Sequence, residues 1–242
     1  MTEPVIDEAM AALTRDAGVA EGETLLKATD LTVQFGGLTA LDSVSFDIRR
    51  GEILGLIGPN GAGKTTCFNA ITGVYRPTSG TVDFDGERIG RRKRHQITRL
   101  GIARTFQNIR LWGEMTALEN VVVGTDARHH TSVPGALIRS PRHRREERTA
   151  IEKAAALLEF VGIADRAEEK ARNLPYGDQR RLEIARALAT EPKLLCLDEP
   201  AAGFNPSEKA ALIELIRAIR DDGYTVLLIE HDMRVVMGVA DR

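Results

Sequence analysis

The segment GPNGAGKTT, residues 58–66, constrains the fold of this chain more than any other stretch of its sequence. It matches the pattern G-x-x-x-x-G-K-[ST], with an apolar run of strand length before it and a segment of helical spacing after it. In such a turn, backbone N–H groups and the positive end of the helix dipole converge on phosphate oxygens. The sequence therefore predicts a strand, a phosphate-binding loop and a helix in succession.

The residues of this loop have the chemistry to hold a triphosphate and a magnesium ion. Lys64 supplies a point charge for the β and γ phosphates, and the hydroxyl of Thr65 can bind Mg²⁺. A glycine turn that merely begins a helix is the alternative, which the flanking strand and helix disfavour. The predicted nucleotide-binding residues are Gly58, Pro59, Asn60, Gly61, Ala62, Gly63, Lys64, Thr65 and Thr66.

Two further segments place ionisable side chains after short apolar runs. In LLCLDEP, Asp198 can hold the Mg²⁺ shell and Glu199 can polarise an attacking water. His231 follows the run YTVLLIE, where an imidazole can reach a γ-phosphate, although a lone histidine is more often structural. Because ligands bind at the edge where parallel strands end, we predict that these side chains and Lys64 form one catalytic site.

The composition excludes several classes of protein. Of the 242 residues, 43% are hydrophobic and 28% are charged, and the formal net charge of -2 gives no support to general nucleic-acid binding. Two cysteines, Cys67 and Cys196, indicate no disulfide framework and favour a reducing cytoplasm. No apolar run approaches the roughly 20 residues of a membrane span. We therefore expect the chain to reach a membrane only by docking on other proteins.

The pattern of apolar residues divides the chain into parts of different type. Residues 1–24 lack a basic start and an apolar core, so they predict a flexible extension, with a short helix around 9–13, rather than a secretory signal. Residues 25–107 alternate as strands do and then contain the phosphate-binding loop. The stretch from about 108–189 has helical periodicity, and 190–242 predict a strand, a helix and a strand. We predict an α/β fold with an inserted helical subdomain.

Six segments, taken in order, resemble the motifs of the nucleotide-binding subunits of ABC transporters. They are GPNGAGKTT, ARTFQNIRLW with Gln107, LPYGDQRRLEIARAL, LLCLDEP, AAGFNP and His231. The resemblance extends from about Leu25 to the C-terminus and implies an ABC ATPase domain over residues 25–242. It implies a P-loop NTPase core with an antiparallel β part and an inserted helical subdomain, ATP and Mg²⁺ as cofactors, and ATP hydrolysis as the activity.

The same resemblance assigns roles outside the phosphate-binding loop. Phe35 is similar to the aromatic residue that stacks on adenine. Gln107 is similar to the catalytic glutamine that contacts Mg²⁺ and the attacking water and links the α/β core to the helical subdomain. The implied metal ligands are Thr65, Gln107 and Asp198. Residues 174–181 lie at the signature position, which caps the ATP of a second subunit in a head-to-tail dimer. The implied nucleotide contacts in that segment are Tyr176, Gly177, Asp178 and Gln179.

Within the family, the chain looks most like the larger of the two ATPases in branched-chain amino acid importers. The similar segments are YGDQRRLEIARAL, DEPAAGFNPSE, IEHDM and ARTFQNIRLWGEMTALENV. This resemblance implies a second ABC ATPase in a hetero-pair (a homodimer is the alternative), two transmembrane permeases and a separate substrate-binding protein. It implies a peripheral place on the cytoplasmic face of the plasma (inner) membrane and no nucleic-acid partner. Importers of urea, short amides or other amino acids stay open as alternatives.

Three residues depart from the general pattern of the family. Pro175 replaces the signature serine and removes a hydroxyl and a backbone N–H. Tyr176 replaces a glycine that permits close approach to phosphate. Asn205 stands where the loop after the carboxylates usually has aspartate. We therefore expect the two ATP sites of a dimer to be unequal.

Other features favour competing interpretations. The basic segments at 91–95 and 125–148, the second expected to be loop-like, slightly favour a soluble ABC ATPase that acts on nucleic acid or ribosomes, although such runs are more often solvated surfaces. The apolar Leu111, Trp112 and Met115 could face membrane-spanning partners or pack in the core. A nucleotide sensor without turnover is a third class, against which the predicted catalytic glutamate argues.

Overall fold

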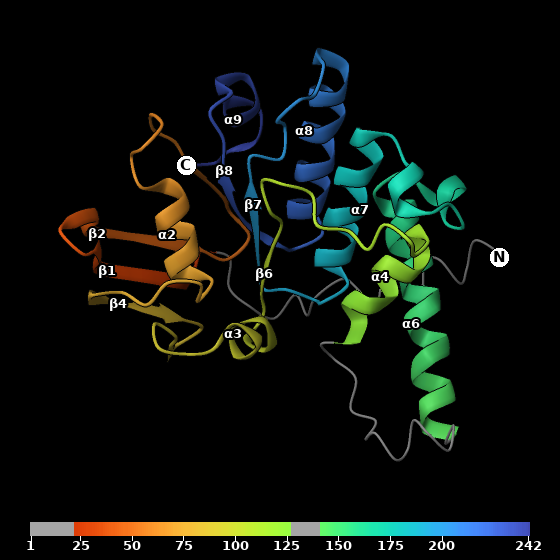
Figure 1. Cartoon of the computed structure of the whole chain (residues 1–242), viewed down its shortest axis with the longest axis horizontal. Helices are drawn as coiled ribbons and strands as arrows, with labels where there is room; N and C mark the ends of the chain where they lie inside the picture. The colour runs from red at the N-terminus through yellow and green to blue at the C-terminus, as the bar shows by residue number, and fades with distance from the viewer. Residues whose placement is uncertain (1–21, 127–140) are drawn as a thin grey trace. The chain divides into compact units, whose positions relative to one another are not determined.

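The computed structural model describes residues 22–126 and 141–242 (Figure 1). These residues cluster into two compact units, named here the α/β unit and the helical unit. The α/β unit comprises residues 22–107 and 193–242, and the helical unit comprises residues 108–126 and 141–192. The helix predicted around 9–13 and most of the predicted N-terminal extension lie outside the described residues.

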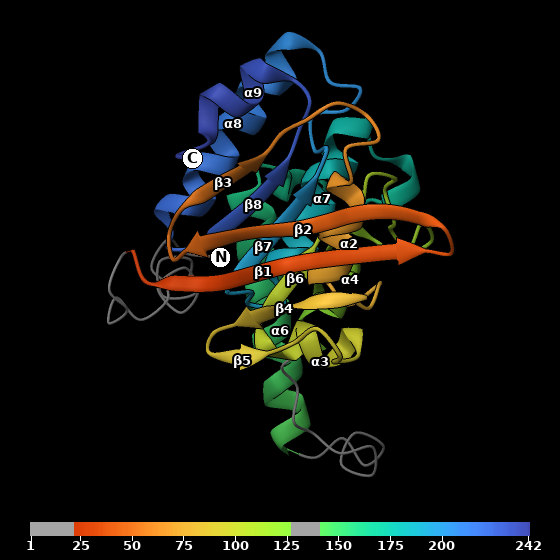
Figure 2. The ribbon, with the colours of Figure 1, turned by 90° about the vertical axis from the view of Figure 1, so that its left-hand side faces the viewer.

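Two sheets form the framework of the α/β unit (Figure 2). One is antiparallel with the order β2-β1-β4-β5, and the other is parallel with the order β3-β8-β7-β6. The strands are β1 (Thr24–Phe35), β2 (Leu38–Arg49), β3 (Ile53–Leu56), β4 (Ser79–Phe84), β5 (Glu87–Arg88), β6 (Ile102–Arg104), β7 (Leu194–Asp198) and β8 (Thr225–Ile229). Every residue of β7 and β8 is buried, as the continuous apolar runs predict for a covered parallel sheet.

One helix of the α/β unit shares a core with both sheets. The helices are α2 (Lys64–Ile71), α3 (Arg94–Leu100), α8 (Pro206–Asp221) and α9 (Met233–Val239). Phe68 and Ile71 of α2 are buried in one cluster with Leu26 and Phe84 of the antiparallel sheet and Cys196 of the parallel sheet. This packing holds α2 in place, and with it the phosphate-binding loop between β3 and α2.

The helix after the phosphate-binding loop is shorter than its spacing predicts. In the sequence, Phe68, Ile71 and Val74 are spaced to lie on one helical face, but α2 ends at Ile71. Gly73 follows with φ +71, a left-handed conformation that ends helices. This φ is strained for a residue with a Cβ, and a Cβ on Gly73 would also lie 2.5 Å from Cδ1 of Ile97, so the turn favours glycine.

Helix α8 begins with reciprocal hydrogen bonds that involve Asn205. The side-chain oxygen of Asn205 accepts from the N–H of Glu208 at 3.0 Å, and the carboxylate of Glu208 accepts from the N–H of Asn205 at 2.7 Å. Pro206 occupies the first turn, where its missing N–H is not needed. Asparagine in place of aspartate therefore serves here as a helix cap.

The helical unit consists of α4 (Ala117–Thr125), α6 (Pro141–Phe160) and α7 (Tyr176–Leu188), with short 3-10 helices at Ala164–Arg166 and Ala171–Asn173. Helices α4 and α7 approach so closely that a Cβ on Gly124 would lie 2.5 Å from the carbonyl oxygen of Arg186. The buried Asn120 donates to the carbonyl oxygens of Thr116 (2.9 Å) and Trp112 (3.1 Å). None of the described helices is long and apolar enough to cross a bilayer.

The prediction that 125–148 form a loop is wrong at both ends. Thr125 is the last residue of α4, and α6 begins at Pro141, so residues 141–148 are helical. Arginine and glutamate are strong helix formers, and Arg148 forms an i,i+4 ion pair with Glu152 at 3.9 Å. The charge of this run obscured its helical character. Residues 127–140 lie outside the described residues.

Candidate functional site

The loop between β3 and α2 encloses the ammonium group of Lys64. Its Nζ atom donates hydrogen bonds to the carbonyl oxygens of Gly58 (2.6 Å) and Pro59 (2.9 Å). Gly63 has φ +84, and a Cβ on it would lie 2.6 Å from the carbonyl oxygen of Ala40, so only glycine fits there. The backbone therefore wraps around one cation immediately before a helix N-terminus, which is the arrangement that binds phosphate.

The nine predicted residues of this loop are accessible to a ligand. None of them is buried. The exposed ones are Pro59, Asn60, Gly61, Ala62 and Thr65, and the half-buried ones are Gly58, Gly63, Lys64 and Thr66. A nucleotide can thus approach the loop from solvent without displacing core residues.

Three predicted catalytic residues meet at the edge of the parallel sheet where β7 and β8 end. Oε2 of Glu199 accepts a hydrogen bond from Nε2 of Gln107 at 2.9 Å. The same oxygen lies 3.9 Å from Nδ1 of His231. The side chain of Glu199 is 19% exposed and that of His231 is 60% exposed. A held carboxylate, an amide and an accessible imidazole therefore share one site.

The backbone of Glu199 is in an uncommon conformation. Its φ of +47 lies in the left-handed region, which costs a residue with a Cβ of order 1 kcal/mol. The N–H of Glu199 donates to the carbonyl oxygen of Ile229 at 2.9 Å, and this bond ties the end of β7 to the end of β8. Such conformations cluster at functional sites, where surrounding structure holds them.

Asp198, the predicted metal ligand, is buried and has a partner that the sequence analysis missed. Its Oδ2 atom accepts a hydrogen bond from Nη2 of Arg104 at 2.7 Å. Arg104 is the last residue of the short strand β6, three positions before Gln107. One signal in the sequence could have identified Arg104: it is a charged residue that directly follows the apolar pair Ile102-Ala103.

Glu230 is a second residue that the sequence analysis missed. Its side chain is almost completely buried. Among the described residues, the donors to its carboxylate are backbone N–H groups. Oε1 accepts from Ala201 at 2.9 Å, and Oε2 accepts from His231 at 3.0 Å and Asp232 at 3.3 Å. Glu230 thereby joins the segment after Glu199 to the segment that carries the histidine.

The predicted metal ligands offer suitable donors for Mg²⁺. Thr65, Gln107 and Asp198 provide a hydroxyl, an amide oxygen and a carboxylate, and Mg²⁺ binds oxygen ligands, usually one or two carboxylates together with waters and substrate phosphates. Among the described residues, no group of three or more His, Cys, Asp and Glu side chains could hold a metal ion. The donor set therefore fits Mg²⁺ that is bound together with a nucleotide.

The two cysteines lie in the core of the α/β unit. Cys67 and Cys196 are both free and buried. Burial raises the pKa of each thiol to about 12, so neither is a thiolate at neutral pH. They contribute packing rather than nucleophilic chemistry.

Phe35 lies at the end of β1, where Gly36-Gly37 turn the chain into β2. Its ring is exposed and contacts Tyr75 edge to face, with centroids 4.9 Å apart. An exposed aromatic face next to a second ring suits base stacking, which the resemblance implies for this residue.

The signature segment lies at the start of α7 in the helical unit. Pro175 precedes the helix and offers no side-chain hydrogen bond to it, and Tyr176 is exposed. Asp178 forms an ion pair with Arg166 at 3.1 Å. Gln179 donates from Nε2 to the carbonyl oxygen of Leu174 at 2.8 Å. Three of the four predicted contact residues are thus engaged within their own unit, because the hydroxyl of Tyr176 accepts from Nη2 of Arg180 at 3.4 Å although the residue is exposed.

A buried ion pair within α7 lies next to this segment. Arg180 donates from Nη1 to Glu183 at 3.1 Å, and both side chains are 2% exposed. The guanidinium also lies 5.8 Å from the ring centroid of Tyr176. The sequence does not reveal this arrangement, because a helical charge pair normally indicates a solvated face.

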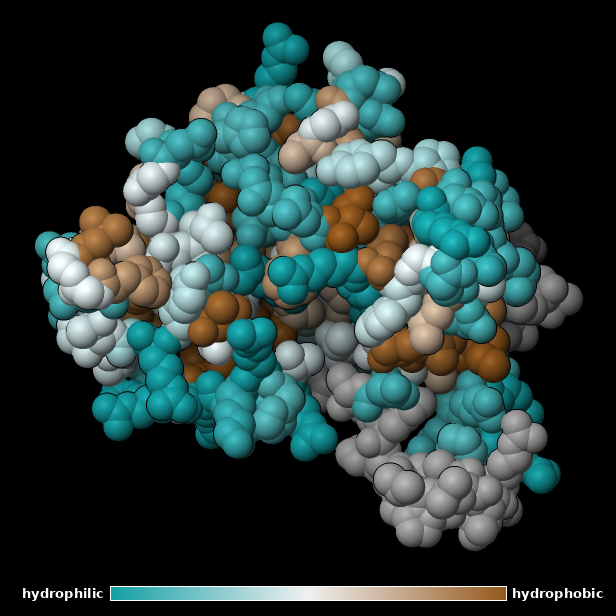
Figure 3. Space-filling view, viewed as in Figure 1, coloured by the Kyte–Doolittle hydropathy of each residue, from teal (hydrophilic) through white to brown (hydrophobic). Residues whose placement is uncertain are grey.

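The apolar residues after Gln107 are mainly at the surface. Trp112 and Met115 are exposed and Leu111 is half-buried. The face of the molecule drawn in Figure 3 is largely hydrophilic, with apolar residues in separate patches. The guanidinium of Arg186 lies 4.8 Å from the centre of the Trp112 ring. Core packing therefore does not explain Trp112 and Met115.

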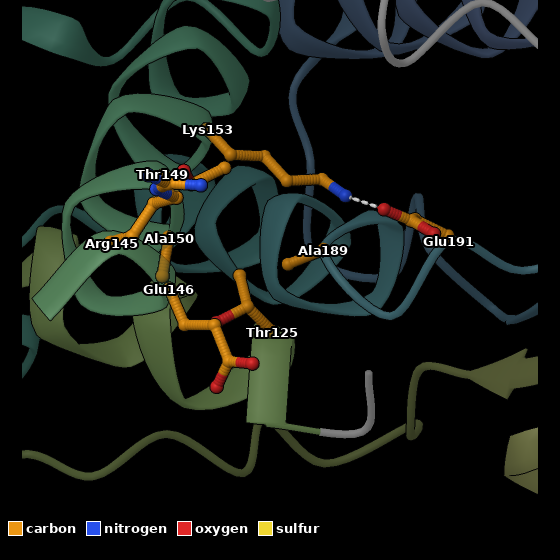
Figure 4. A pocket seen from close by; sticks show the side chains of 8 residues that line it. All are labelled: Thr125, Arg145, Glu146, Thr149, Ala150, Lys153, Ala189 and Glu191. Atoms are coloured by element: carbon orange, nitrogen blue, oxygen red, sulfur yellow. Dashed lines mark hydrogen bonds and ion pairs between the residues drawn. The ribbon is translucent and has the colours of Figure 1, made fainter. Parts of the chain in front are cut away.

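The helical unit contains a cavity of about 230 Å³ that shares no residue with the predicted site (Figure 4). It is lined by Thr125, Arg145, Glu146, Thr149, Ala150, Lys153, Ala189 and Glu191. The ammonium group of Lys153 pairs with the carboxylate of Glu191 at one side of it, so these two opposite charges balance each other.

Comparison with known sequences connects this geometry to a family. The family model described as ABC transporter matches residues 41–202. The chain is 48% identical over 221 residues to the high-affinity branched-chain amino acid transport ATP-binding protein LivG of Salmonella typhimurium, over 91% of this chain and 87% of that protein. It is 48% identical to the corresponding protein BraF of Pseudomonas aeruginosa, over 90% and 86%. Identity to the phosphate-import ATP-binding protein PhnC of Mycolicibacterium smegmatis is 37%, over 93% and 84%.

Solved structures give the same result for the fold. An ATP-binding cassette of an ABC transporter in its ADP conformation superposes with a TM-score of 0.78 and 33% identity, over 90% of this chain and 85% of that chain. A nucleotide-free cassette superposes with a TM-score of 0.78 and 32% identity, over 90% and 86%.

Proposed function

The chain belongs to the ABC transporter family, and from this membership we propose that it is the ATP-hydrolysing subunit of an importer for branched-chain amino acids. The predicted family and fold class are confirmed. The relatives named for branched-chain amino acid transport are 48% identical to it, against 37% for the phosphate-import relative. The contact between Glu199 and Gln107, with His231 beside it in a chain that has a phosphate-binding loop, is the observation that carries the proposal.

The proposed mechanism requires positioning rather than covalent chemistry. Lys64 balances charge on the β and γ phosphates, and Phe35 stacks on the base. Glu199 orients the attacking water, with its carboxylate held by Gln107, and His231 stabilises charge on the γ-phosphate. Bound Mg²⁺ would neutralise charge on the phosphate oxygens, held through the hydroxyl of Thr65, the amide of Gln107 and the carboxylate of Asp198.

The proposed assembly contains further chains. A second ABC ATPase supplies its signature to the nucleotide held by Lys64, and residues 174–181 of this chain face the nucleotide of that partner. Two permeases respond to the conformational change of the ATPase pair, and the exposed Trp112 and Met115 suit contact with them. A separate binding protein delivers the substrate. This arrangement places the chain peripherally on the cytoplasmic face of the plasma (inner) membrane.

The variant Glu199→Gln tests the catalytic part of the proposal. We expect it to bind ATP with nearly natural affinity but to lose at least about a hundredfold in turnover, because the amide cannot act as a base toward water. ATP binding and phosphate release should be measured in the assembled transporter. Glu214→Gln, an exposed change on α8, serves as the matched control. Undiminished turnover in the Glu199 variant would refute the assigned role.

Uptake measurements test the substrate. Vesicles that contain this chain with its partners should accumulate labelled leucine, isoleucine or valine when ATP is supplied inside. Accumulation of urea or a short amide instead would retain the transport function and replace the substrate class. ATP turnover that responds to nucleic acid and not to a transport substrate would favour the soluble alternative.

A further inference from the structure

Arg104 occupies the interior of the α/β unit at a place that no predicted role explains. Its side chain is 10% exposed, and that of its partner Asp198 is 4% exposed. The rings of Phe68 and Phe106 flank the guanidinium, with centroids 5.2 Å and 5.1 Å from Cζ. An arginine held between two aromatic rings and a buried carboxylate is an integral part of the site rather than a surface cation.

The guanidinium links the end of β7 to the helix that follows the phosphate-binding loop. Nη2 donates to Oδ2 of Asp198 at 2.7 Å. Nη1 donates to Oδ1 of Asn69 at 2.6 Å and lies 3.3 Å from Oγ1 of Thr72. Because the oxygens near Nη1 are neutral, the carboxylate of Asp198 is the group that balances the positive charge in these contacts.

The remaining nitrogen of Arg104 indicates that charge, and not hydrogen bonding alone, keeps the residue in place. Nε is buried and has no hydrogen-bond partner among the described residues. A buried donor without a partner is unfavourable, so the ion pair with Asp198 has to offset it. A buried carboxylate is likewise unfavourable unless a positive charge lies next to it.

We propose that Arg104 is a positioning residue for the metal-binding carboxylate. It neutralises and orients Asp198 when no divalent cation is bound, and it thereby limits how strongly nucleotide binding depends on Mg²⁺. The inference rests on the proposed function, in which Asp198 contributes to the Mg²⁺ site. The guanidinium and Mg²⁺ both neutralise the carboxylate of Asp198, so the presence of one reduces the stabilisation that the other contributes.

Removal of the guanidinium should therefore change Mg²⁺-free binding most. Without Arg104 and without Mg²⁺, any negative charge that Asp198 carries is uncompensated and opposes the approach of a polyphosphate. Added Mg²⁺ restores the balance and recovers most of the affinity. The ratio of the dissociation constants without and with Mg²⁺ is the quantity that reports this coupling.

The experiment measures binding of a fluorescent ATP analogue to the purified full chain, in excess EDTA and in millimolar Mg²⁺. For Arg104→Met we expect the ratio to rise about tenfold, mainly through weaker binding in EDTA. Arg104→Lys keeps the charge and should leave the ratio close to the natural value, even where its melting temperature falls. A role confined to folding would lower stability without a selective effect in EDTA.

Two further variants make the test specific. Asp198→Asn removes the negative charge, so in the Asp198→Asn background the Arg104→Met change should no longer raise the ratio. If Arg104→Met does not fold, Arg104→Gln replaces it, because glutamine is neutral and its side-chain amide can still donate hydrogen bonds to Asn69 and Thr72.

The outcomes separate this inference from the proposed function. Failure of the natural chain to bind the analogue in either buffer would refute both. Normal binding with an unchanged ratio in the neutral Arg104 variants would overturn the positioning role alone. An equal rise in the ratio with Asp198 present or replaced by asparagine would also overturn it, because the effect would then not act through that carboxylate.

Discussion

Single buried side chains determine where the catalytic groups of this chain lie. Glu230 is the clearest case, since one carboxylate accepts from the N–H groups of Ala201, His231 and Asp232. The chain segments on either side of these bonds carry Glu199 and His231. A buried polar group that satisfies three backbone donors stabilises the local backbone and has no simple substitute.

We expect Glu230→Ala to reduce the free energy of unfolding by about 2–3 kcal/mol, because buried N–H groups lose their acceptor. Turnover should fall as well, since the segments that carry Glu199 and His231 lose their connection. Urea denaturation and ATP hydrolysis measure the two effects. Glu230→Gln keeps one acceptor oxygen and should show a smaller loss of stability. Natural stability in the alanine variant would contradict this account.

At the scale of elements, one aspartate in the hairpin of β4 and β5 links that hairpin to residues next to β2 and β7. Asp85 has φ +52 and Gly86 has φ +78, as a tight hairpin turn requires. The Asp85 carboxylate pairs with Arg50, which follows β2, and with Lys193, which precedes β7. Burial raises the pKa of Asp85, but the ion pairs with Lys193 and Arg50 outweigh burial and hold that pKa below its usual value.

The lowered pKa predicts a stability difference that depends on pH. Asp85→Asn preserves the turn, because asparagine tolerates left-handed backbone, and removes the charge. We expect a loss of about 1 kcal/mol in the free energy of unfolding at pH 7. A carboxylate with a lowered folded-state pKa stabilises above the unfolded pKa of about 3.9, and this contribution disappears as the pH falls through the folded value. Denaturation curves of the two proteins should therefore converge below about pH 4; a constant difference down to pH 2 would contradict the ion-pair account.

At the scale of the whole molecule, the altered signature segment predicts unequal ATP sites in an assembled pair. The nucleotide held by Lys64 would meet the partner's signature, whereas the partner's nucleotide would meet Pro175 and Tyr176 of this chain. Pro175 donates no N–H, and the exposed Tyr176 ring occupies space next to the helix start. Phosphate contacts should be weaker there, so turnover at the partner's site should be slower.

We expect Glu199→Gln in this chain to remove more of the turnover of the complex than the equivalent change in the partner. Phosphate release from complexes that carry one substitution at a time gives the comparison, with Glu214→Gln as the control in this chain. We also expect weak hydrolysis by the isolated chain, because no conventional signature is then present. Equal losses from the two subunits would rule out the asymmetry.

The amino-acid sequence by itself determined the local parts of this protein. The phosphate-binding loop, the strands β7 and β8 and the cap of α8 depend on residues within a few positions of one another, and local sterics and hydrogen bonding decide them. Gly63 and Lys64 are therefore recognisable without a structure. The sequence was misleading where charge concealed a helix, at the start of α6, and where a left-handed glycine ended α2 early.

Only the tertiary structure decided which side chains share a carboxylate. Gln107 and Glu199 are 92 positions apart, and Arg104 and Asp198 are 94 apart, yet each pair is hydrogen-bonded. No periodicity or spacing encodes these contacts, because they depend on the order in which parallel strands are placed side by side. The carboxylates could be identified from the sequence, whereas their partners were determined by the packing of β6 against β7. The physical reason is that a buried charge is stable only when an oppositely charged or hydrogen-bonding group lies next to it.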